Sequence, residues 1–275
     1  MNTKSLSFVA LLLPILALLP LPIALADGQM APVAASSNPT AIIDALTPGT
    51  GLAEVQRLAQ QGSAEAQNRL GWMYDNGQGI AQDSKQAVYW FRKAAEQGLA
   101  KAQTNLGIEY AHGTGVPQDY KQAMYWYQKA AEQGYDDAQV KMGTLYANGQ
   151  GVAQDYKQAM YWYQKAAAQG NADAQYGIGT MYQAGQGVAQ DYKQAFYWYQ
   201  KAAEQGQAMA ENNLGAFYGL GTEGVAQDKT KAAYWYSKSA MQGYAVAQKN
   251  LENLYATPDS DGGSTYVRPV HNHRR

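Results

Sequence analysis

The sequence DYKQAMYWYQKAAEQG, at residues 119–134, is the strongest structural signal in this chain, because it returns almost unchanged at residues 155–170 and 191–206. Within it, small and aromatic residues follow the spacing i, i+3, i+4, i+7, i+8, which predicts an amphipathic helix, called helix B below. Asp119 opens the segment, and a glutamine follows three residues later. This is the spacing of a capping box, so we expect the carboxylate to accept free backbone N–H groups of the first turn.

A second helical pattern, called helix A, precedes each helix B. Ala102, Leu106 and Tyr110 recur every four residues, and the pattern ends at a Gly-x-Gly turn, where glycine can adopt the positive φ that ends a helix. The turns are Gly77 and Gly79, Gly113 and Gly115, Gly149 and Gly151, and Gly185 and Gly187. The aspartates that begin each helix B are Asp83, Asp119, Asp155, Asp191 and Asp228. Asp228 has Lys231 in place of the glutamine, so we expect the weakest cap there.

The helical pair repeats about every 36 residues. The tryptophans of helix B are Trp90, Trp126, Trp162, Trp198 and Trp235. A hairpin of this length is too short to hold a core alone, so neighbouring units must stack. The sequence therefore predicts an all-α solenoid, an α/α superhelix of about five hairpins with a half-repeat cap at each end. The predicted solenoid at 52–256 consists of a half-repeat at 52–62, repeats at 63–98, 99–134, 135–170, 171–206 and 207–243, and a terminal helix at 244–256.

The amino-terminal segment has the pattern of a secretory signal. Lys4 precedes an apolar run, and the small-residue site Ala24-Leu25-Ala26 suits cleavage before Asp27. We expect a signal peptide at 1–26, with no stable membrane insertion after cleavage, and a mature chain that is periplasmic or secreted. The flanking segments, at 27–51 and 257–275, are predicted to be a flexible linker and a disordered tail.

Composition removes most catalytic chemistry. The chain has no cysteine and three histidines, and no His-Glu-x-x-His, Gly-x-Ser-x-Gly or Ser-x-x-Lys motif follows the signal segment. His112 is the only histidine inside the repeats, and we expect it at the carboxyl end of a helix A. We therefore expect no enzyme, no catalytic residue, no metal site and no cofactor. A formal net charge of −1 supplies no global field for nucleic acid, so we expect no nucleic-acid partner. The oligomeric state stays open.

The repeated residues resemble those of the Sel1-like repeat, a relative of the tetratricopeptide repeat. The residues that carry the resemblance are Ala102, Leu106-Gly107, Tyr110, Gly113-x-Gly115-Val116, Asp119, Lys121-x-Ala123, Trp126, Lys129-Ala130-Ala131 and Gly134. The resemblance covers residues 63–243 and implies a scaffold or adaptor that grips other proteins. Some cysteine-rich secreted members have been assigned β-lactamase-like activity, but this chain lacks their cysteines.

Three side-chain columns call for an explanation. Glycine occurs inside each helix A, where it costs about 1 kcal/mol relative to alanine, and we expect the tryptophan face of helix B to lie close over it. The tryptophans are expected in the core. The tyrosines that precede them are expected on the outer face, with a lysine one helical turn to either side for cation–π contacts, as Lys121 and Lys129 flank Tyr125. Either a solubilised outer face or a binding strip fits this pattern. The glycines are Gly71, Gly107, Gly143, Gly179 and Gly215, and the tyrosines are Tyr89, Tyr125, Tyr161, Tyr197 and Tyr234.

Differences between the units concentrate on one side of helix A. They fall five before, two before and two after the Leu106-like position, which faces the concave groove in related helical-repeat families. The candidate partner-binding residues are Glu65, Asn68, Trp72, Lys101, Thr104, Ile108, Asp137, Val140, Thr144, Asp173, Tyr176, Thr180, Asn212 and Ala216. Unlike side chains on a repeated frame can recognise one particular partner, whereas drift at exposed positions would give the same pattern.

We therefore expect an exported scaffold that binds a protein or peptide partner on the concave helix A surface. One alternative is a cell-envelope adaptor for glycan or cell-wall machinery, with tyrosines stacked on sugar rings. A β-lactamase-like hydrolase is a further alternative.

Overall fold

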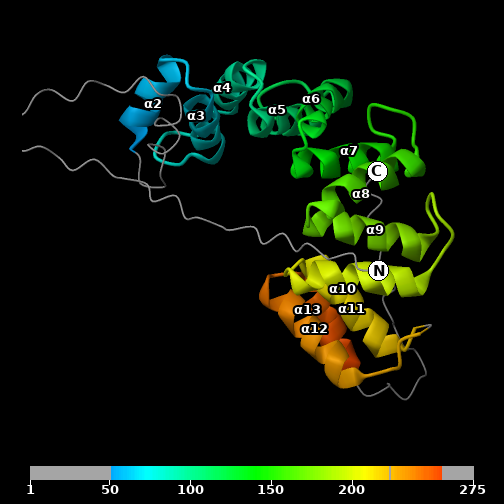
Figure 1. Ribbon diagram of the computed structural model, residues 1–275. Coiled ribbons are helices and arrows are strands. Elements are labelled where there is room, and N and C mark those ends of the chain that lie inside the picture. The colour runs from blue at the N-terminus through cyan, green and yellow to red at the C-terminus, as the bar shows by residue number, and fades with distance from the viewer. Residues whose placement is uncertain (1–50, 223, 256–275) are drawn as a thin grey trace, which may run out of the picture. The chain divides into compact units, whose positions relative to one another are not determined.

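The computed structural model describes residues 51–222 and 224–255, and within them it contains twelve helices and no strand (Figure 1). The predicted all-α fold is confirmed. The predicted signal peptide and the tail at 257–275 lie outside the described residues, as does most of the predicted linker. The helices are α2 (Leu52–Gln60), α3 (Ala64–Asn76), α4 (Ser84–Glu96), α5 (Ala100–His112), α6 (Tyr120–Glu132), α7 (Asp136–Asn148), α8 (Tyr156–Ala168), α9 (Ala172–Ala184), α10 (Tyr192–Glu204), α11 (Ala208–Leu220), α12 (Lys229–Met241) and α13 (Ala245–Tyr255).

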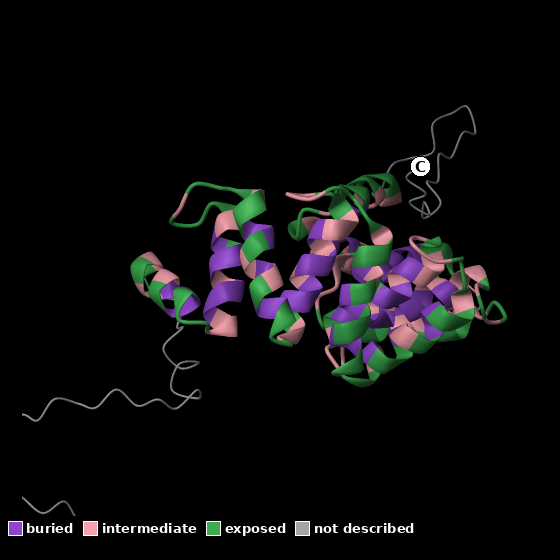
Figure 2. Ribbon diagram, turned by 90° about the horizontal axis from the view of Figure 1, so that it is seen from above, coloured by how far each residue is buried: buried purple, intermediate pink, exposed green. Residues whose placement is uncertain are grey.

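Each helix packs on the next helix along the chain. The pairs α3–α4, α5–α6, α7–α8, α9–α10 and α11–α12 form five hairpins, and the helix B of each hairpin also contacts the helix A of the following one. Buried residues lie on the sides of the helices that face their neighbours (Figure 2). This is the predicted solenoid of helical hairpins. Among the described residues no helix combines the length and the apolar character that crossing a membrane requires.

Glycine and aspartate set the ends of the helices, as their spacing predicts. At the carboxyl end of α5, Gly113 has φ 74°, a left-handed conformation that glycine adopts without strain. At the start of α6, Asp119 accepts hydrogen bonds from the backbone N–H groups of Lys121 and Gln122, at 2.9 and 3.1 Å. Asp228 accepts one such bond, from Lys231. The smaller number agrees with the weaker cap expected for α12.

The ring that lies over the helix A glycine is not tryptophan but the aromatic residue after it. A Cβ atom added to Gly107 would lie 2.5 Å from Cε1 of Tyr127 and 3.2 Å from the carbonyl oxygen of Ala123. The other four hairpins repeat this contact, in the pairs Gly71–Phe91, Gly143–Tyr163, Gly179–Tyr199 and Gly215–Tyr236. The glycine therefore allows close approach within a hairpin, as expected, but the expected tryptophan partner was wrong.

The tryptophans instead join one hairpin to the one before it. Trp126 of α6 packs in a cluster with Val88 and Phe91 of α4 and Leu106 of α5. Trp126 is 9% exposed, whereas the other four helix B tryptophans are only half-buried. Tyr127 is the more deeply buried neighbour, at 2%. The two adjacent aromatic residues thus have different contacts. Tyr127 packs on the glycine of its own hairpin, and Trp126 packs on the preceding hairpin.

A row of buried glutamines also joins the units. Gln103 is 4% exposed, its Nε2 donates to the backbone oxygen of Ala95, and its Oε1 accepts from Nε2 of Gln133. Gln67, Gln139 and Gln175 accept from the equivalent glutamines in the same way. These bonds satisfy polar groups in a position that water does not reach.

Candidate partner-binding surfaces

The candidate residues of helix A separate by exposure. Trp72 is the most exposed apolar one, at 45%, and it lies near the end of α3. Lys101, Asp137 and Asp173 are exposed. The half-buried candidate residues are Glu65, Ile108, Val140, Thr144, Tyr176 and Thr180.

Four candidate residues are buried, because neighbouring residues already contact them. Asn68 is 8% exposed and accepts a hydrogen bond from Asn105 of the next helix A. Asn212 accepts one from Asn250 in the same way. Thr104 donates to a backbone oxygen of its own helix, and Ala216 is 7% exposed. The accessible part of the candidate surface therefore consists of the exposed and half-buried residues.

The five tyrosines of helix B form an exposed row, as the sequence predicts. Their exposed fractions run from 46% at Tyr89 to 57% at Tyr234. The lysine one turn later, such as Lys129, lies over the ring, with Nζ 4.7 Å from the centroid of Tyr125. Each ring also meets the following tryptophan edge to face, at 5.0 to 5.4 Å between centroids. Only the lysine that follows the tyrosine has this contact, although the preceding one was also expected to flank it.

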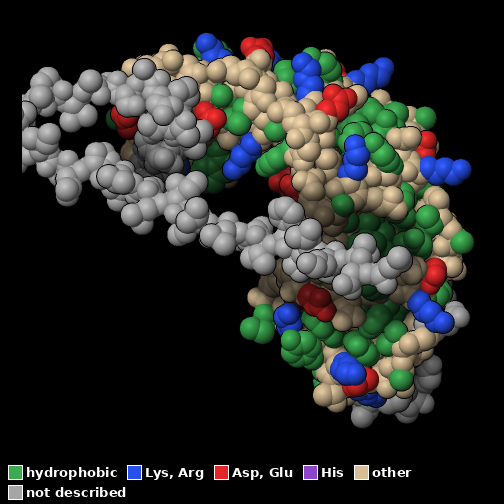
Figure 3. All heavy atoms as spheres, viewed as in Figure 1, with side chains coloured by type: hydrophobic (Ala, Val, Ile, Leu, Met, Phe, Trp, Pro, Cys, Tyr) green, Lys and Arg blue, Asp and Glu red, His purple; other side chains and the backbone are tan. Residues whose placement is uncertain are grey.

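Charge is divided between the two helix rows. The five helix B segments, without their capping aspartates, carry twelve Lys or Arg residues and three Glu residues, and the caps add five negative charges. The helix A segments α3 to α11 carry three Lys or Arg residues and seven Asp or Glu residues. On the face in Figure 3, basic and acidic side chains both occur, with hydrophobic side chains between many of them. The net charge of −1 therefore conceals a basic row and an acidic row.

Glu109 of helix A is a buried carboxyl group, and one of its two oxygens has no hydrogen-bond partner. Glu109 is 4% exposed, and its Oε2 has no hydrogen bond. Burial, and then the nearby negative charge of Asp75, raise the pKa of the Glu109 carboxyl to about 7. The equivalent residues of the other units are apolar: Met73, Leu145, Met181 and Phe217.

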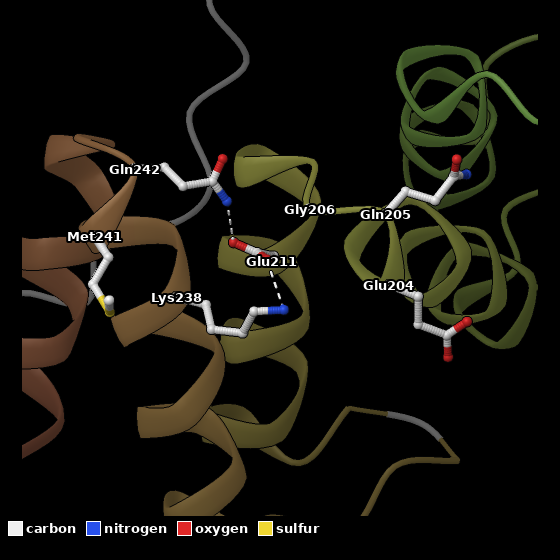
Figure 4. Close-up of a pocket in the computed structure, with 7 residues that line it drawn as sticks. All are labelled: Glu204, Gln205, Gly206, Glu211, Lys238, Met241 and Gln242. Carbon is white, nitrogen blue, oxygen red and sulfur yellow. Dashed lines mark hydrogen bonds and ion pairs between the residues drawn. The ribbon is translucent and has the colours of Figure 1, made fainter.

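A second buried carboxylate lines an open pocket in the fifth unit (Figure 4). Glu211 of α11 has no exposed surface and occupies the place of the buried glutamines. Its Oε1 lies 3.1 Å from Nζ of Lys238, and its Oε2 accepts from Nε2 of Gln242 at 2.7 Å. The pocket has a volume of about 700 Å³, and its lining also includes Glu204, Gln205, Gly206 and Met241.

The one histidine among the described residues lies at a helix end. His112 is exposed at the carboxyl end of α5, where it was expected. No set of three or more His, Cys, Asp or Glu residues that could hold a metal ion lies within the described ranges.

Reasoning from the sequence missed both buried carboxylates and the glutamine row. The signal was present in the comparison of units. Four helix A segments have glutamine at the place where the fifth has Glu211. Glu109 is charged, whereas the equivalent residues of the other four units are apolar. These positions lie beside the apolar stripe, where a polar residue needs a partner.

Comparison with known protein families identifies the repeat. The family model for the Sel1 repeat matches residues 64–99, 100–135, 136–171, 172–207 and 208–244, each one residue later at its start than the predicted unit. Among curated proteins, none matches this sequence.

Solved structures agree with the family match. A Sel1 repeat protein from Oxalobacter formigenes is 38% identical, with a TM-score of 0.67 over 79% of this chain and 82% of that one. A putative Sel1 repeat protein from Klebsiella pneumoniae is 24% identical, with a TM-score of 0.51 over 74% and 98%. An immunity protein from Pseudomonas aeruginosa, also 24% identical with a TM-score of 0.51 over 72% and 76%, shares the fold. Repeats of this type form scaffolds that commonly mediate protein interactions, and this chain belongs to the Sel1 repeat family.

Proposed function

We propose that this protein is an exported scaffold that binds a protein or peptide partner on the variable face of its helix A row. It acts by positioning the partner and not by chemistry. The observation that carries the proposal is the contrast between a nearly constant helix B and a helix A face that changes from unit to unit.

The exposed residues of that face support a specific partner. Trp72 leaves a large indole 45% exposed, and Ile108 is half-buried two residues after the Leu position of the next unit. Lys101, Asp137 and Asp173 supply exposed charges of both signs at the equivalent position of three successive helix A segments. Aromatic residues are frequent anchors of protein interfaces, and flanking charges set which partners are rejected.

Affinity capture with matched variants tests the proposal. The mature protein is compared with a Trp72→Ala, Ile108→Ala, Tyr176→Ala triple variant and with a Tyr125→Ser, Tyr161→Ser double variant of helix B. A partner identified by mass spectrometry should be lost from the first variant and kept by the second. Because Tyr176 also contacts the ring of Tyr199, circular dichroism must show that the triple variant stays folded. Equal recovery with all three proteins contradicts the helix A assignment.

Export has a separate test. The small-residue site before Asp27 supports cleavage there, so amino-terminal sequencing of protein from the periplasm or the medium should begin at Asp27. Recovery of only the uncleaved chain from the cytoplasm contradicts export.

A second candidate is a cell-envelope adaptor that binds glycan, and the exposed tyrosine row favours it. A Tyr125→Ser, Tyr161→Ser, Tyr197→Ser variant should then lose sedimentation with insoluble cell-wall glycan, while the helix A variant keeps it. If wild type does not sediment with the glycan, this candidate is wrong.

A further inference from the structure

The pocket of the fifth unit differs from the equivalent places in the other units in a way that points to a ligand. In three units, a buried glutamine donates to a backbone oxygen at the end of the preceding helix B, as Gln103 does to Ala95. Glu211 replaces that glutamine. A carboxylate accepts but does not donate, so it cannot make the equivalent bond to Ala203. It brings a negative charge to a place with no exposed surface.

The Glu211 carboxylate has one cationic partner, Lys238. Gln242 donates to Oε2, but Oε1 has no hydrogen bond and meets only the ion-pair partner Lys238. A buried carboxylate is stable only when both oxygens are well paired. Oε1 therefore retains the capacity to accept a charge-assisted hydrogen bond.

The Lys238 side chain has an alternative contact, the ring of the exposed tyrosine Tyr234. In the other four hairpins the equivalent lysine lies 4.7 to 5.2 Å from the centroid of the exposed tyrosine ring. Lys238 lies 5.8 Å from Tyr234, because it reaches toward Glu211. Its side chain is 37% exposed, so water and ligands reach it. A cation from outside could replace it at Glu211 while Lys238 moves over the tyrosine.

The rest of the pocket suits a cation on an apolar stem. Met241 is 88% exposed at a position where three other units have glutamate, and Glu204 adds a second carboxylate on the opposite side of the pocket (Figure 4). An arginine side chain has an apolar stem and a planar group that donates several hydrogen bonds. We propose that this pocket binds an arginine side chain of an extended peptide, with its guanidinium on Oε1 of Glu211 in exchange for Lys238.

None of the residues that line this pocket belongs to the candidate set of the variable helix A face, and the test separates the two sites. The mature protein is titrated with acetyl-Gly-Arg-Gly-amide up to about 10 mM, the range expected for one ion-paired side chain. Binding is followed by NMR through the side-chain amide of Gln242. The citrulline peptide, which has the same shape without the charge, is the ligand control. The arginine peptide should shift the Gln242 signal, and the citrulline peptide should not.

Two variants of the pocket complete the test. Glu211→Gln restores the residue that four other units carry, so it should fold, and it should weaken binding about tenfold or more because it removes a charged acceptor. Lys238→Gln removes the internal competitor and should tighten binding several-fold.

No response of the wild type, equal binding of the citrulline peptide, or unchanged binding by Glu211→Gln overturns the proposal. Weaker binding by Lys238→Gln overturns the exchange. The Trp72→Ala, Ile108→Ala pair of substitutions should leave this titration unchanged, whichever way the capture experiment turns out.

Discussion

Helix A and helix B recur with the same interval in the chain, but the side chains of helix A vary more from repeat to repeat than those of helix B. Helix B keeps a capping aspartate, an exposed tyrosine, an inter-unit tryptophan and, in each hairpin, an aromatic ring over the glycine. Helix A keeps its glycine but places Glu109 and Glu211 in buried positions of single units. The residues of helix B that make the repeated contacts are thus constant, whereas helix A contains buried carboxylates that occur in single units. The predictions below alter one row or the other.

The largest effect is expected from two tyrosines that lie two residues apart on α10. Tyr199 has no exposed surface and lies against Gly179, so Tyr199→Ala should lower the free energy of unfolding by about 3–5 kcal/mol. Tyr197 is 47% exposed, and Tyr197→Ala should cost less than about 1 kcal/mol, the size of an exposed cation–π contact. Urea unfolding of both variants measures this. Similar losses of stability in the two variants would mean that the exposed tyrosines stabilise the fold as much as the buried ones do.

The glycine of helix A gives the next largest effect. Gly107→Ala forces a methyl group into the ring of Tyr127, and overpacking of this kind costs about 1–3 kcal/mol, which the better helix propensity of alanine only partly offsets. Glu252 stands at the equivalent place in α13 and is exposed, so Glu252→Ala should be neutral or slightly stabilising. Thermal unfolding of the two variants decides whether the hairpin contact explains the glycine.

Glu109 makes stability depend on pH. Because its folded pKa is raised to about 7 from about 4.5, the folded state holds a proton that the unfolded state has lost between these values. Its contribution to the free energy of unfolding is therefore greatest at acidic pH and is lost as pH rises through 7. Glu109→Met copies Met73 and should be more stable relative to wild type at pH 8 than at pH 5. An equal difference at both pH values would contradict the buried proton.

The helix caps provide the smallest effect. Asp155 accepts two backbone N–H groups, and Asp155→Ala should cost about 1 kcal/mol. Asp228 accepts one, so Asp228→Ala should cost about half as much. Chemical denaturation of single variants compares the two. A larger loss at Asp228 would show that its ion pair with Lys231 matters more than the cap bonds.

Periodicity was sufficient for the fold, but not for the contacts between helices. The interval between tryptophans, the glycine turns and the capping aspartates predicted the hairpins and their order. Trp126 and Tyr127 are adjacent apolar residues on the same helix, so spacing alone does not tell which one meets Gly107.

The site was less predictable, for a related reason. Asn68 and Asn212 were assigned to the partner surface, yet each is covered by an asparagine of the next unit. Their burial depends on how successive helices stack, which no pattern within one unit contains. Glu211 was recognisable only as the exception in a row whose role becomes clear once the glutamine bonds are seen.

The exposed carboxylate of Glu252 also limits the length of the array. Where every earlier helix A has a glycine that admits an aromatic ring, α13 presents a charge, so the helix B of another molecule cannot dock there without burying an unpaired anion. Solenoids grow into filaments when their last repeat can template a further one. We therefore expect the Glu252 carboxylate to disfavour head-to-tail docking of a further hairpin on α13.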